Sequence, residues 1–335
     1  MLLNLYILKR FFLFVLLIFS LSGLLNAQDL SKKSEHEFTV YVMPTMYPLD
    51  WSGPANLYKS MKSCYLKTIT LPDNYLLGHV AVGLTSSLLE KELFIAETSS
   101  SLQEKLDLIM KQKVGFGILG APMRGRIETH DELARKLDVY AHRNKLAFIR
   151  FKINELAARR MLTFIKNYSS KINKTNSASD FYGGAFWPLY HKEGAGCSAF
   201  GMAMLDLVGI LPPESKEWYV DVKIPMKIVG GGYNNGKKVR VKTIKRTEKW
   251  FRNDGVANVD YVRHLLYEPS IMFDWILERR EMSDSIYKPF NDGNVPGLIV
   301  DMTHVVPDTA KPIFTERISP NIFVEKYMEK INAAE

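Results

Sequence analysis

Cysteine is scarce in this chain of 335 residues, in which Cys64 and Cys197 are the only two. Two thiols exclude a disulfide-rich scaffold, and they are too few to form a thiolate cage around zinc. The seven histidines are scattered, and no two of them are spaced two or four residues apart. We therefore predict neither a metal ion nor a cofactor.

Other familiar signatures are also missing. No serine stands in the Gly-x-Ser-x-Gly pattern, which disfavours a serine hydrolase. The glycine triplet 230–232 is not followed by the Gly-Lys-Ser/Thr sequence of a phosphate-binding loop. The sequence contains no internal repeat and no low-complexity segment.

The N-terminus has the pattern of an export signal. Lys9 and Arg10 precede a short apolar block at 11–25, and Leu25-Asn26-Ala27 offers a cleavage site of small residues. We predict that residues 1–27 are a signal peptide and that the protein is periplasmic or secreted. The block is short for a membrane span, although an uncleaved anchor remains the alternative.

Without residues 1–27 the chain has 42 basic and 36 acidic residues, a mild positive excess. The clearest basic cluster contains Lys237, Lys238, Arg240, Lys242, Lys245 and Arg246. It has two interpretations: the solvated face of a β-hairpin, or a surface attracted to an anionic polymer or lipid. Nucleic acid is not expected as the partner of an exported chain, and the sequence does not indicate an oligomeric state.

Hydrophobic periodicity predicts a mixture of strands and helices. Strands are expected at 38–43, 65–69, 76–84, 93–98, 114–119 and 146–153. Helices are expected at 101–111, 129–142, 154–167 and 197–211, the first with Leu102, Leu106 and Ile109 on its inner face and the second and third capped by Thr129 and Asn154.

The prolines Pro212 and Pro213 mark the best boundary in the chain. We predict a core at 28–211 and a C-terminal extension of unknown role at 212–335. Within the extension, 222–229 and 238–244 are expected to form a β-hairpin around a glycine-rich tip, and 297–302 a late strand.

Cys197 is the first residue of a helical pattern and follows Gly194-Ala195-Gly196. A thiol in that place faces the unpaired N–H groups and the positive end of the helix dipole, which favour thiolate. A disulfide with Cys64 is the alternative for an exported protein. Because its surroundings suit a nucleophile, we expect Cys197 to be reactive and Cys64 to be a buried, inert thiol.

A cysteine nucleophile needs a base, and the base needs a third group to hold its tautomer. His79 lies on the strand at 76–84 and shares one face with the small residues Ala81 and Gly83. Glu97 ends the next strand, and in an antiparallel hairpin its carboxylate is expected to accept the ring N–H of His79. His191, on a loop before Cys197, and His304, at the end of the late strand, are weaker candidates for the base.

Three segments resemble a known family: Gly78-His79-Val80-Ala81-Val82-Gly83, Phe94-Ile95-Ala96-Glu97-Thr98 and Gly196-Cys197-Ser198-Ala199-Phe200. They are similar to the circularly permuted branch of the NlpC/P60 superfamily, papain-like thiol hydrolases that include the YiiX-type and lecithin retinol acyltransferase-like groups. The resemblance covers residues 38–211. It implies an α+β fold, with an antiparallel sheet packed on the cysteine helix.

By this resemblance Cys197 is the nucleophile, His79 the base and acid, and Glu97 the orienting group. The Cys197 backbone N–H would bind the oxyanion, with Tyr182 or Tyr190 as a second donor. The aromatic loop at 181–190 would bind substrate through Tyr182, Trp187 and Tyr190.

The implied function is an exported cysteine hydrolase that cleaves amide or ester bonds, with an envelope peptide as the leading substrate class and lipid acyl groups second. The competing hypothesis is a catalytically silent binding protein on the same scaffold, with the aromatic loop and the basic cluster as its interaction surface.

Overall fold

A computed structural model describes residues 35–71, 75 and 77–333. The chain divides into an N-terminal segment, Met1–Glu35, and one compact unit, His36–Glu335. The predicted signal peptide at 1–27 lies outside the described residues. Within the described ranges, no helix is both long enough and apolar enough to cross a membrane.

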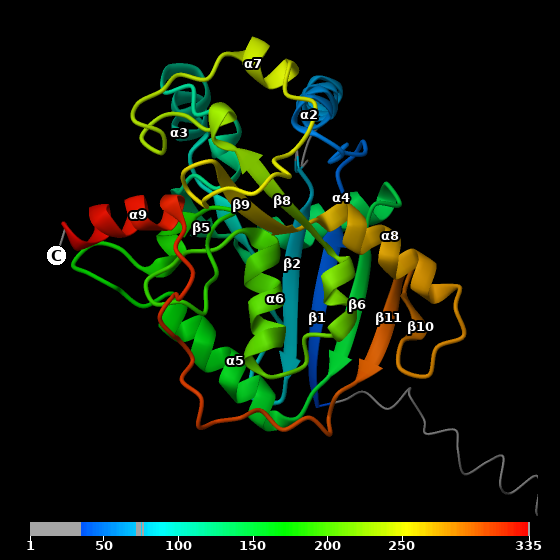
Figure 1. The fold of residues 1–335 in the computed structure, drawn as a ribbon. Coiled ribbons are helices and arrows are strands. Elements are labelled where there is room, and N and C mark those ends of the chain that lie inside the picture. The colour runs from blue at the N-terminus through cyan, green and yellow to red at the C-terminus, as the bar shows by residue number, and fades with distance from the viewer. Residues whose placement is uncertain (1–34, 72–74, 76, 334–335) are drawn as a thin grey trace, which may run out of the picture. The chain divides into compact units, whose positions relative to one another are not determined.

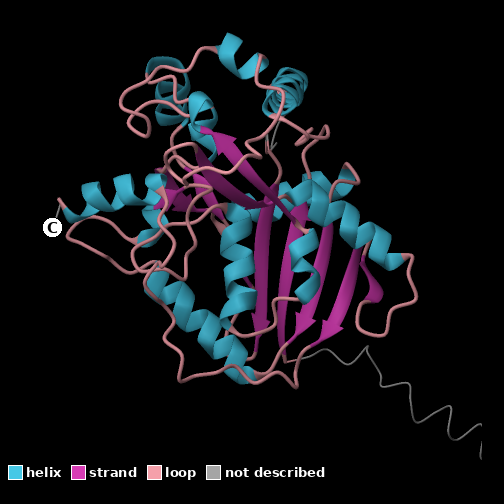
Figure 2. Cartoon of the chain, in the orientation of Figure 1, coloured by secondary structure: helices cyan, strands magenta, loops and turns pink. Residues whose placement is uncertain are grey.

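The compact unit is built around a six-stranded sheet within the described residues (Figures 1 and 2). All neighbouring strands pair antiparallel except β11 and β6, which are parallel. This arrangement agrees with the expected α+β class. In spatial order the strands are β10 (Lys288–Asp292), β11 (Val295–Asp301), β6 (Ala147–Lys152), β1 (His36–Met43), β2 (His79–Ser86) and β3 (Leu93–Ile95).

Helices cover both faces of this sheet. The larger core packs Val40 and Val82 of the sheet against α5 (Glu155–Tyr168), α6 (Cys197–Leu207) and α8 (Pro269–Arg280). On the other face, Ala81 packs against α4 (His130–His142). Because successive residues of a strand point to opposite faces, the apolar β2 sequence supplies both cores.

Two smaller sheets and several short helices complete the unit. The sheets are β4 (Glu97–Ser99), β5 (Met123–Ile127) and β7 (Phe181–Tyr182), and β8 (Tyr219–Pro225) with β9 (Tyr261–Tyr267). The remaining helices are α2 (Pro54–Thr68), α3 (Leu102–Leu106), α7 (Val241–Lys245), α9 (Ile322–Asn332), the π-helix η1 (Asp107–Lys111), and the 3₁₀ helices η2 (Phe116–Leu119), η3 (Ala178–Asp180), η4 (Pro213–Glu217) and η5 (Met226–Ile228).

The predicted helix starts at Thr129 and Asn154 are confirmed. Thr129 accepts a hydrogen bond from the Glu132 backbone N–H, and Asn154 accepts one from Ala157. The cysteine helix begins at Cys197 as expected but ends at Leu207, four residues early.

The strand expected at 65–69 is wrong, because these residues belong to the end of α2 and the turn after it. Pro54 opens this helix, and Leu57, Cys64 and Thr68 form its buried face. The strand expected at 114–119 is also wrong. Gly115 has φ +60°, and the 3₁₀ helix η2 follows it.

The expected β-hairpin of 222–229 with 238–244 is not formed; instead β8 pairs with β9, more than thirty residues farther along the chain. Val239 donates its backbone N–H to Lys113 O, and Ile244 is buried in α7. The alternation of basic and apolar residues at 238–242 suits a strand, but tertiary contacts override this local preference.

The expected orientation of the helix at 101–111 is reversed. The helix is present as α3 followed by η1, and Leu108 is the residue it buries. Leu102, Leu106 and Ile109 are exposed. A helical period identifies an apolar stripe, but it does not say whether the stripe meets the core.

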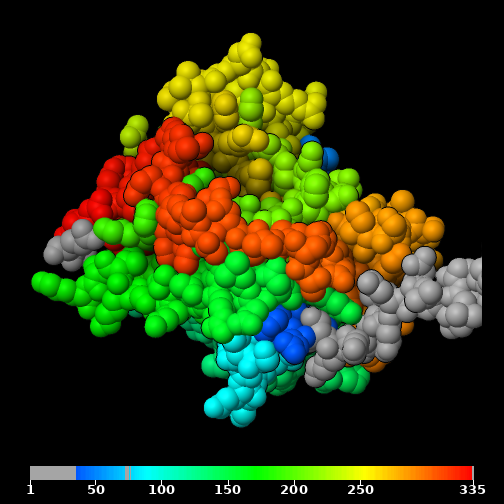
Figure 3. Space-filling model, turned by 90° about the horizontal axis from the view of Figure 1, so that it is seen from below, coloured from blue at the N-terminus to red at the C-terminus, as the bar shows by residue number. Residues whose placement is uncertain are grey.

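The sheet extends across the expected boundary at 211/212, because β10 and β11 come from the C-terminal third and β11 pairs with β6. The chain after β11 then runs along the outside of the unit, as the orange-red segment of Figure 3 shows. It is held to α5 by hydrogen bonds from Asn154 to Val305 O and from Arg160 to Lys311 O. The C-terminal third is therefore part of the same packed body.

Candidate active site

Cys197 lies at the N-terminus of α6 and is 8% exposed. The N-cap residue, Gly196, makes no side-chain cap hydrogen bond. The thiol thus lies at the positive end of the helix dipole. Cys64 is buried in α2, and these two described cysteines do not form a disulfide.

His79 is the first residue of β2 and is 2% exposed. The residue before it, Gly78, has φ +72°. A Cβ on Gly78 would lie 2.9 Å from Met43 O and 3.0 Å from a Pro269 side-chain carbon. Only glycine suits this turn, which fixes the place where the histidine enters the sheet.

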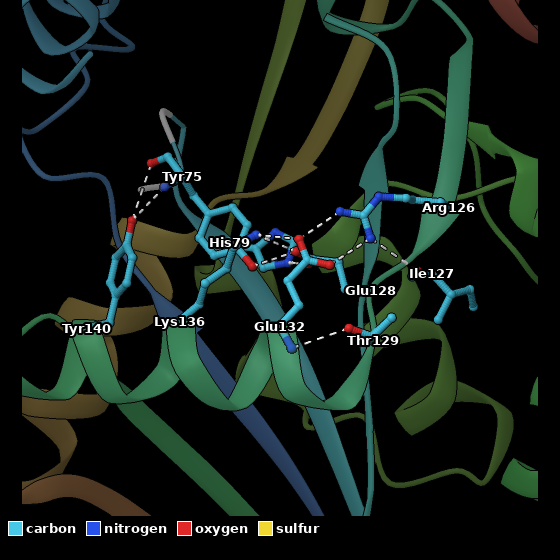
Figure 4. A network of polar contacts seen from close by, with 9 residues as sticks. All are labelled: Tyr75, His79, Arg126, Ile127, Glu128, Thr129, Glu132, Lys136 and Tyr140. Atoms are coloured by element: carbon cyan, nitrogen blue, oxygen red, sulfur yellow. Dashed lines mark hydrogen bonds and ion pairs between the residues drawn. The ribbon is translucent and has the colours of Figure 1, made fainter. Parts of the chain in front are cut away.

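Glu128, which follows β5 directly, holds the imidazole of His79. Its Oε2 lies 2.6 Å from His79 Nε2. Its Oε1 accepts hydrogen bonds from Lys136 Nζ at 2.7 Å and from the Tyr75 hydroxyl at 2.8 Å. Figure 4 shows His79, Glu128 and Lys136 in one network of polar contacts.

Burial alone would raise the pKa of Glu128, but the hydrogen bond and charge of His79, together with Lys136, lower this pKa from 4.5 to about 2. The carboxylate is therefore ionised throughout the physiological range.

Tyr75 covers one face of the His79 imidazole. The two rings stack with centroids 3.8 Å apart and 14° between their planes. The Tyr75 backbone N–H donates to the Tyr140 hydroxyl at 2.9 Å, and Lys136 Nζ lies 4.4 Å from the Tyr75 ring centroid. The imidazole is thus fixed both by a hydrogen bond in its plane and by an aromatic ring against its face.

Cys197 and His79 are close enough for the charge and side-chain hydrogen bonding of each to shift the pKa of the other. Because Glu128 occupies Nε2, Nδ1 is the ring nitrogen that remains available to the sulfur. Burial would lower the pKa of His79, but the Cys197 thiolate and the Glu128 carboxylate outweigh it and raise this pKa from 6.5 to about 9.

Two further groups lie near enough to the Cys197 sulfur to favour its thiolate: the Val80 backbone N–H and the Tyr182 hydroxyl. Burial would raise the pKa of Cys197, but the charge and hydrogen bond of His79, followed by these two donors, lower it overall. The pair is therefore electrostatically suited to exist as thiolate and imidazolium at neutral pH.

The expected bond between Glu97 and His79 is absent from the described residues, and Glu128 takes that position. The register pairs Ile95 with Val82, so Glu97, two residues after Ile95, would face away from His79 even if β3 continued. Instead β3 ends at Ile95, and Glu97 starts β4 in a different sheet.

Glu97 is nevertheless close enough to Cys197 and Tyr182 for their charges to influence one another's titration. It is 0% exposed, and its Oε2 lies 3.5 Å from the Tyr168 hydroxyl, while Oε1 has no hydrogen-bond partner among the described residues. Burial raises the pKa of Glu97 to about 10, so this carboxyl is neutral at pH 7. A neutral acid cannot act as the anionic partner of an imidazolium.

Of the three aromatic residues proposed for substrate binding, the structure brings Tyr182 to Cys197. Its hydroxyl also lies near the Cys197 backbone N–H, which lowers the pKa of Tyr182 against the larger effects of the Cys197 charge and of burial. Trp187 stacks against Tyr267 with ring centroids 6.4 Å apart. Arg317 lies over the ring of Tyr190, 4.6 Å from its centroid. Trp187 and Tyr190 are thus engaged by the C-terminal third of the chain.

The loop before Cys197 is fastened by a buried ion pair. Glu193 is fully buried and accepts two hydrogen bonds from Arg317, and Trp187 donates its backbone N–H to the same carboxylate. His191 is exposed on this loop, and its Nε2 lies 4.0 Å from Glu316. His304 is exposed next to Asp301. His191 and His304, the two alternative bases, therefore have exposed surroundings that differ from those of the buried thiol.

Sequence reasoning missed Glu128, Lys136 and Tyr75. Glu128 stands immediately before the Thr129 helix cap, and this position was the only local signal for it. Forty-nine positions separate it from His79, so no motif spacing connects them. Lys136 lies about two helical turns after Glu128, in α4, where the sequence pattern predicts an ordinary solvent-facing lysine.

Two surface cavities, of about 390 and 260 Å³, lie beside β5 and α9. Arg124, Tyr233 and Lys330 line both of them, and Phe181 lines the smaller one. Phe181 precedes Tyr182, so the smaller cavity adjoins the strand that carries the hydroxyl next to Cys197. The thiol itself is not among the lining residues of either cavity.

The described residues contain no group of three or more histidine, cysteine, aspartate or glutamate side chains placed to hold a metal ion. Comparison of the chain with protein-family models, with curated proteins and with solved structures finds no match.

Proposed function

We propose that this protein is a cysteine hydrolase that cleaves amide or ester bonds through an acyl-thioenzyme. The observation that carries the proposal is the buried cluster of Cys197, His79 and Glu128, in which thiol and imidazole shift each other's pKa and the imidazole hydrogen-bonds the carboxylate. A purely structural histidine does not require a thiol on one nitrogen and a carboxylate on the other. This arrangement supplies a nucleophile, a base and an orienting group.

In the first half-reaction the Cys197 thiolate attacks the substrate carbonyl carbon and forms a carbon–sulfur bond. The imidazolium of His79 gives its proton to the leaving nitrogen or oxygen as that bond to carbon breaks. In the second half-reaction neutral His79 takes a proton from water, whose oxygen attacks the thioester. The acid product then departs and the thiolate is restored.

Two donors at the thiol are suited to the oxyanion that forms during each attack. One is the Cys197 backbone N–H at the helix N-terminus, and the other is the Tyr182 hydroxyl. In the resting protein these two groups are neighbours. Glu128, held by Lys136 and Tyr75, is the orienting group in place of Glu97.

The histidine strand precedes the cysteine helix in the chain, and the helix packs on the sheet that contains the histidine. That order supports the proposal of a permuted papain-like core related to the NlpC/P60 superfamily. Together with the predicted signal peptide, it makes an envelope peptide the first substrate class to test and a lipid acyl ester the second.

The chemistry is tested with Cys197→Ala and with the matched control Cys64→Ala, which removes the other buried thiol. Each protein is incubated with peptidoglycan stem peptides and with acyl lipids, and the released products are measured by mass spectrometry. We expect hydrolysis by the wild type and by Cys64→Ala, and none by Cys197→Ala. Equal turnover by Cys197→Ala would exclude the thiol as the nucleophile.

The second candidate is a silent binding protein, and it is favoured by the low exposure of Cys197 and by the tyrosine hydroxyl on its backbone N–H. Iodoacetamide distinguishes the two functions without knowledge of the substrate. A hydrolase requires Cys197 to be alkylated faster than a simple thiol at pH 6. A rate no greater than that of a cysteine peptide would support the silent scaffold instead.

A further inference from the structure

One end of the molecule presents apolar side chains to solvent. The helix formed by α3 and η1 turns Leu108 inward, whereas Leu102, Leu106, Ile109 and Met110 are 71%, 43%, 44% and 67% exposed. Their spacing of four, three and one residues is that of an apolar stripe along one side of a helix. Soluble proteins seldom leave such a stripe on one helix uncovered, so it indicates an interaction surface.

Basic residues gather beside this stripe. The segment 237–249 has seven lysine or arginine residues and one acid, and α2 adds three lysines and no acid. The side chains of Lys237, Lys238, Lys242 and Lys245 are exposed. The basic cluster is therefore a solvated surface, although it is not the β-hairpin that its sequence suggested.

The apolar and basic parts are joined by contacts. Val239 donates its backbone N–H to Lys113 O at 2.9 Å, which ties the basic segment to the chain that leaves η1. Ala55 donates to Thr247 O at 3.0 Å, and Lys245 lies over the Tyr58 ring, so the same segment is tied to α2. Figure 1 shows α2, α3 and α7 at the same end of the molecule.

We propose that this end, formed by the exposed stripe of α3 and η1 with the basic segment 237–249, docks on an anionic lipid membrane. The lysines and arginines lie against the phosphate headgroups, and the four apolar side chains enter the boundary between headgroups and acyl chains. β2 begins at the end of the sheet that faces α2, α3 and α7, so the start of this strand, whose first residue is His79, lies toward the docked side (Figure 1).

Lipid fits this surface better than the other occupants. An anionic polymer would use the basic residues but leave the leucines and methionine in water. A second copy of the chain would bring a second cluster of seven basic residues against the first, and this repulsion disfavours it. An anionic bilayer matches both the charge and the apolar stripe.

The test uses protein that begins at Gln28, which contains the whole compact unit His36–Glu335 and lacks the apolar block of 11–25. Its binding to vesicles of phosphatidylglycerol and phosphatidylcholine is measured by co-sedimentation. We expect binding to vesicles that contain phosphatidylglycerol, weakening as salt is raised, and little binding to pure phosphatidylcholine. Equal binding to both vesicle types would overturn the proposal.

Two surface variants separate the contributions. We expect Leu106→Gln with Met110→Gln to weaken vesicle binding by roughly tenfold through lost apolar insertion. Lys238→Gln with Lys242→Gln should weaken it by roughly tenfold or more, because each basic side chain near an anionic surface contributes separately.

The matched controls are Val306→Gln with Ile318→Gln, both highly exposed outside this surface, and Lys171→Gln with Lys174→Gln. We expect these controls to bind as the wild type does. If the apolar variant binds vesicles normally while the basic variant does not, the surface recognises charge alone and an anionic polymer is its occupant. Concentration-dependent dimers that the apolar variant abolishes would assign the stripe to a second copy. Either result would overturn membrane docking.

Docking does not depend on the proposed thiol chemistry. Cys197→Ala should bind the vesicles as the wild type does. Loss of vesicle binding in the surface variants, with iodoacetamide reactivity unchanged, would separate the two proposals cleanly.

Discussion

Glu128→Gln is the sharpest test of the site. The substitution keeps the shape of the side chain and one hydrogen-bonding oxygen but removes the charge beside His79. The carboxylate pKa is lowered from 4.5 to about 2 in the folded protein. A shift of this size corresponds to about 3 kcal/mol of net stabilisation of the carboxylate, so the groups around Glu128 contribute at least this much against the opposing effect of burial.

His79 and Lys136 share that interaction, so we assign about half of it, roughly 1.5 kcal/mol, to the imidazolium. Losing it should lower the equilibrium constant between the thiolate–imidazolium pair and the neutral pair by about tenfold. We therefore expect Glu128→Gln to slow Cys197 alkylation by iodoacetamide at pH 6, by up to about tenfold. Peptide mass spectrometry distinguishes Cys197 from Cys64 in the same sample.

The matched control is Glu97→Gln, the same substitution at the other buried glutamate. Burial keeps Glu97 neutral at pH 6, since its pKa is about 10, so this change removes no charge and should leave the alkylation rate within about twofold of the wild type. Slow alkylation of Cys197 in Glu97→Gln, together with a normal rate in Glu128→Gln, would refute the assignment of roles. Circular dichroism melts confirm that both variants are folded.

Three further outcomes are expected. Glu97 is neutral in the folded protein and ionises on unfolding, so the free energy of unfolding falls as pH rises above 4.5. Glu97→Gln should therefore stabilise the protein by more than about 1 kcal/mol at pH 8 but not at pH 4, as measured by urea unfolding. Tyr182→Phe removes a donor to the thiolate, so the midpoint of its alkylation–pH profile should shift upward; an unchanged profile would contradict that bond. Arg317→Ala leaves Glu193 buried without its cation and should lower the free energy of unfolding by about 3 kcal/mol in the same urea measurement. Arg263→Ala, which breaks an exposed ion pair, should lower it by less than about 1 kcal/mol.

The amino-acid sequence by itself determined the elements whose signals are local. A side chain that caps the first turn needs only its neighbours, so Thr129 and Asn154 marked two helix starts correctly. The glycine-led helix at Cys197 and the strand at His79 were likewise legible, because backbone freedom and alternation act over a few residues.

Tertiary structure alone decided which distant groups meet. The identity of the carboxylate on His79 depends on strand register and on where β3 ends, and a shift of one residue reverses the face of every side chain. The same limit applies to α3, whose apolar stripe was visible in the sequence although its exposure was not. Periodicity records which residues share a face, whereas only the packing of the whole chain determines what that face meets.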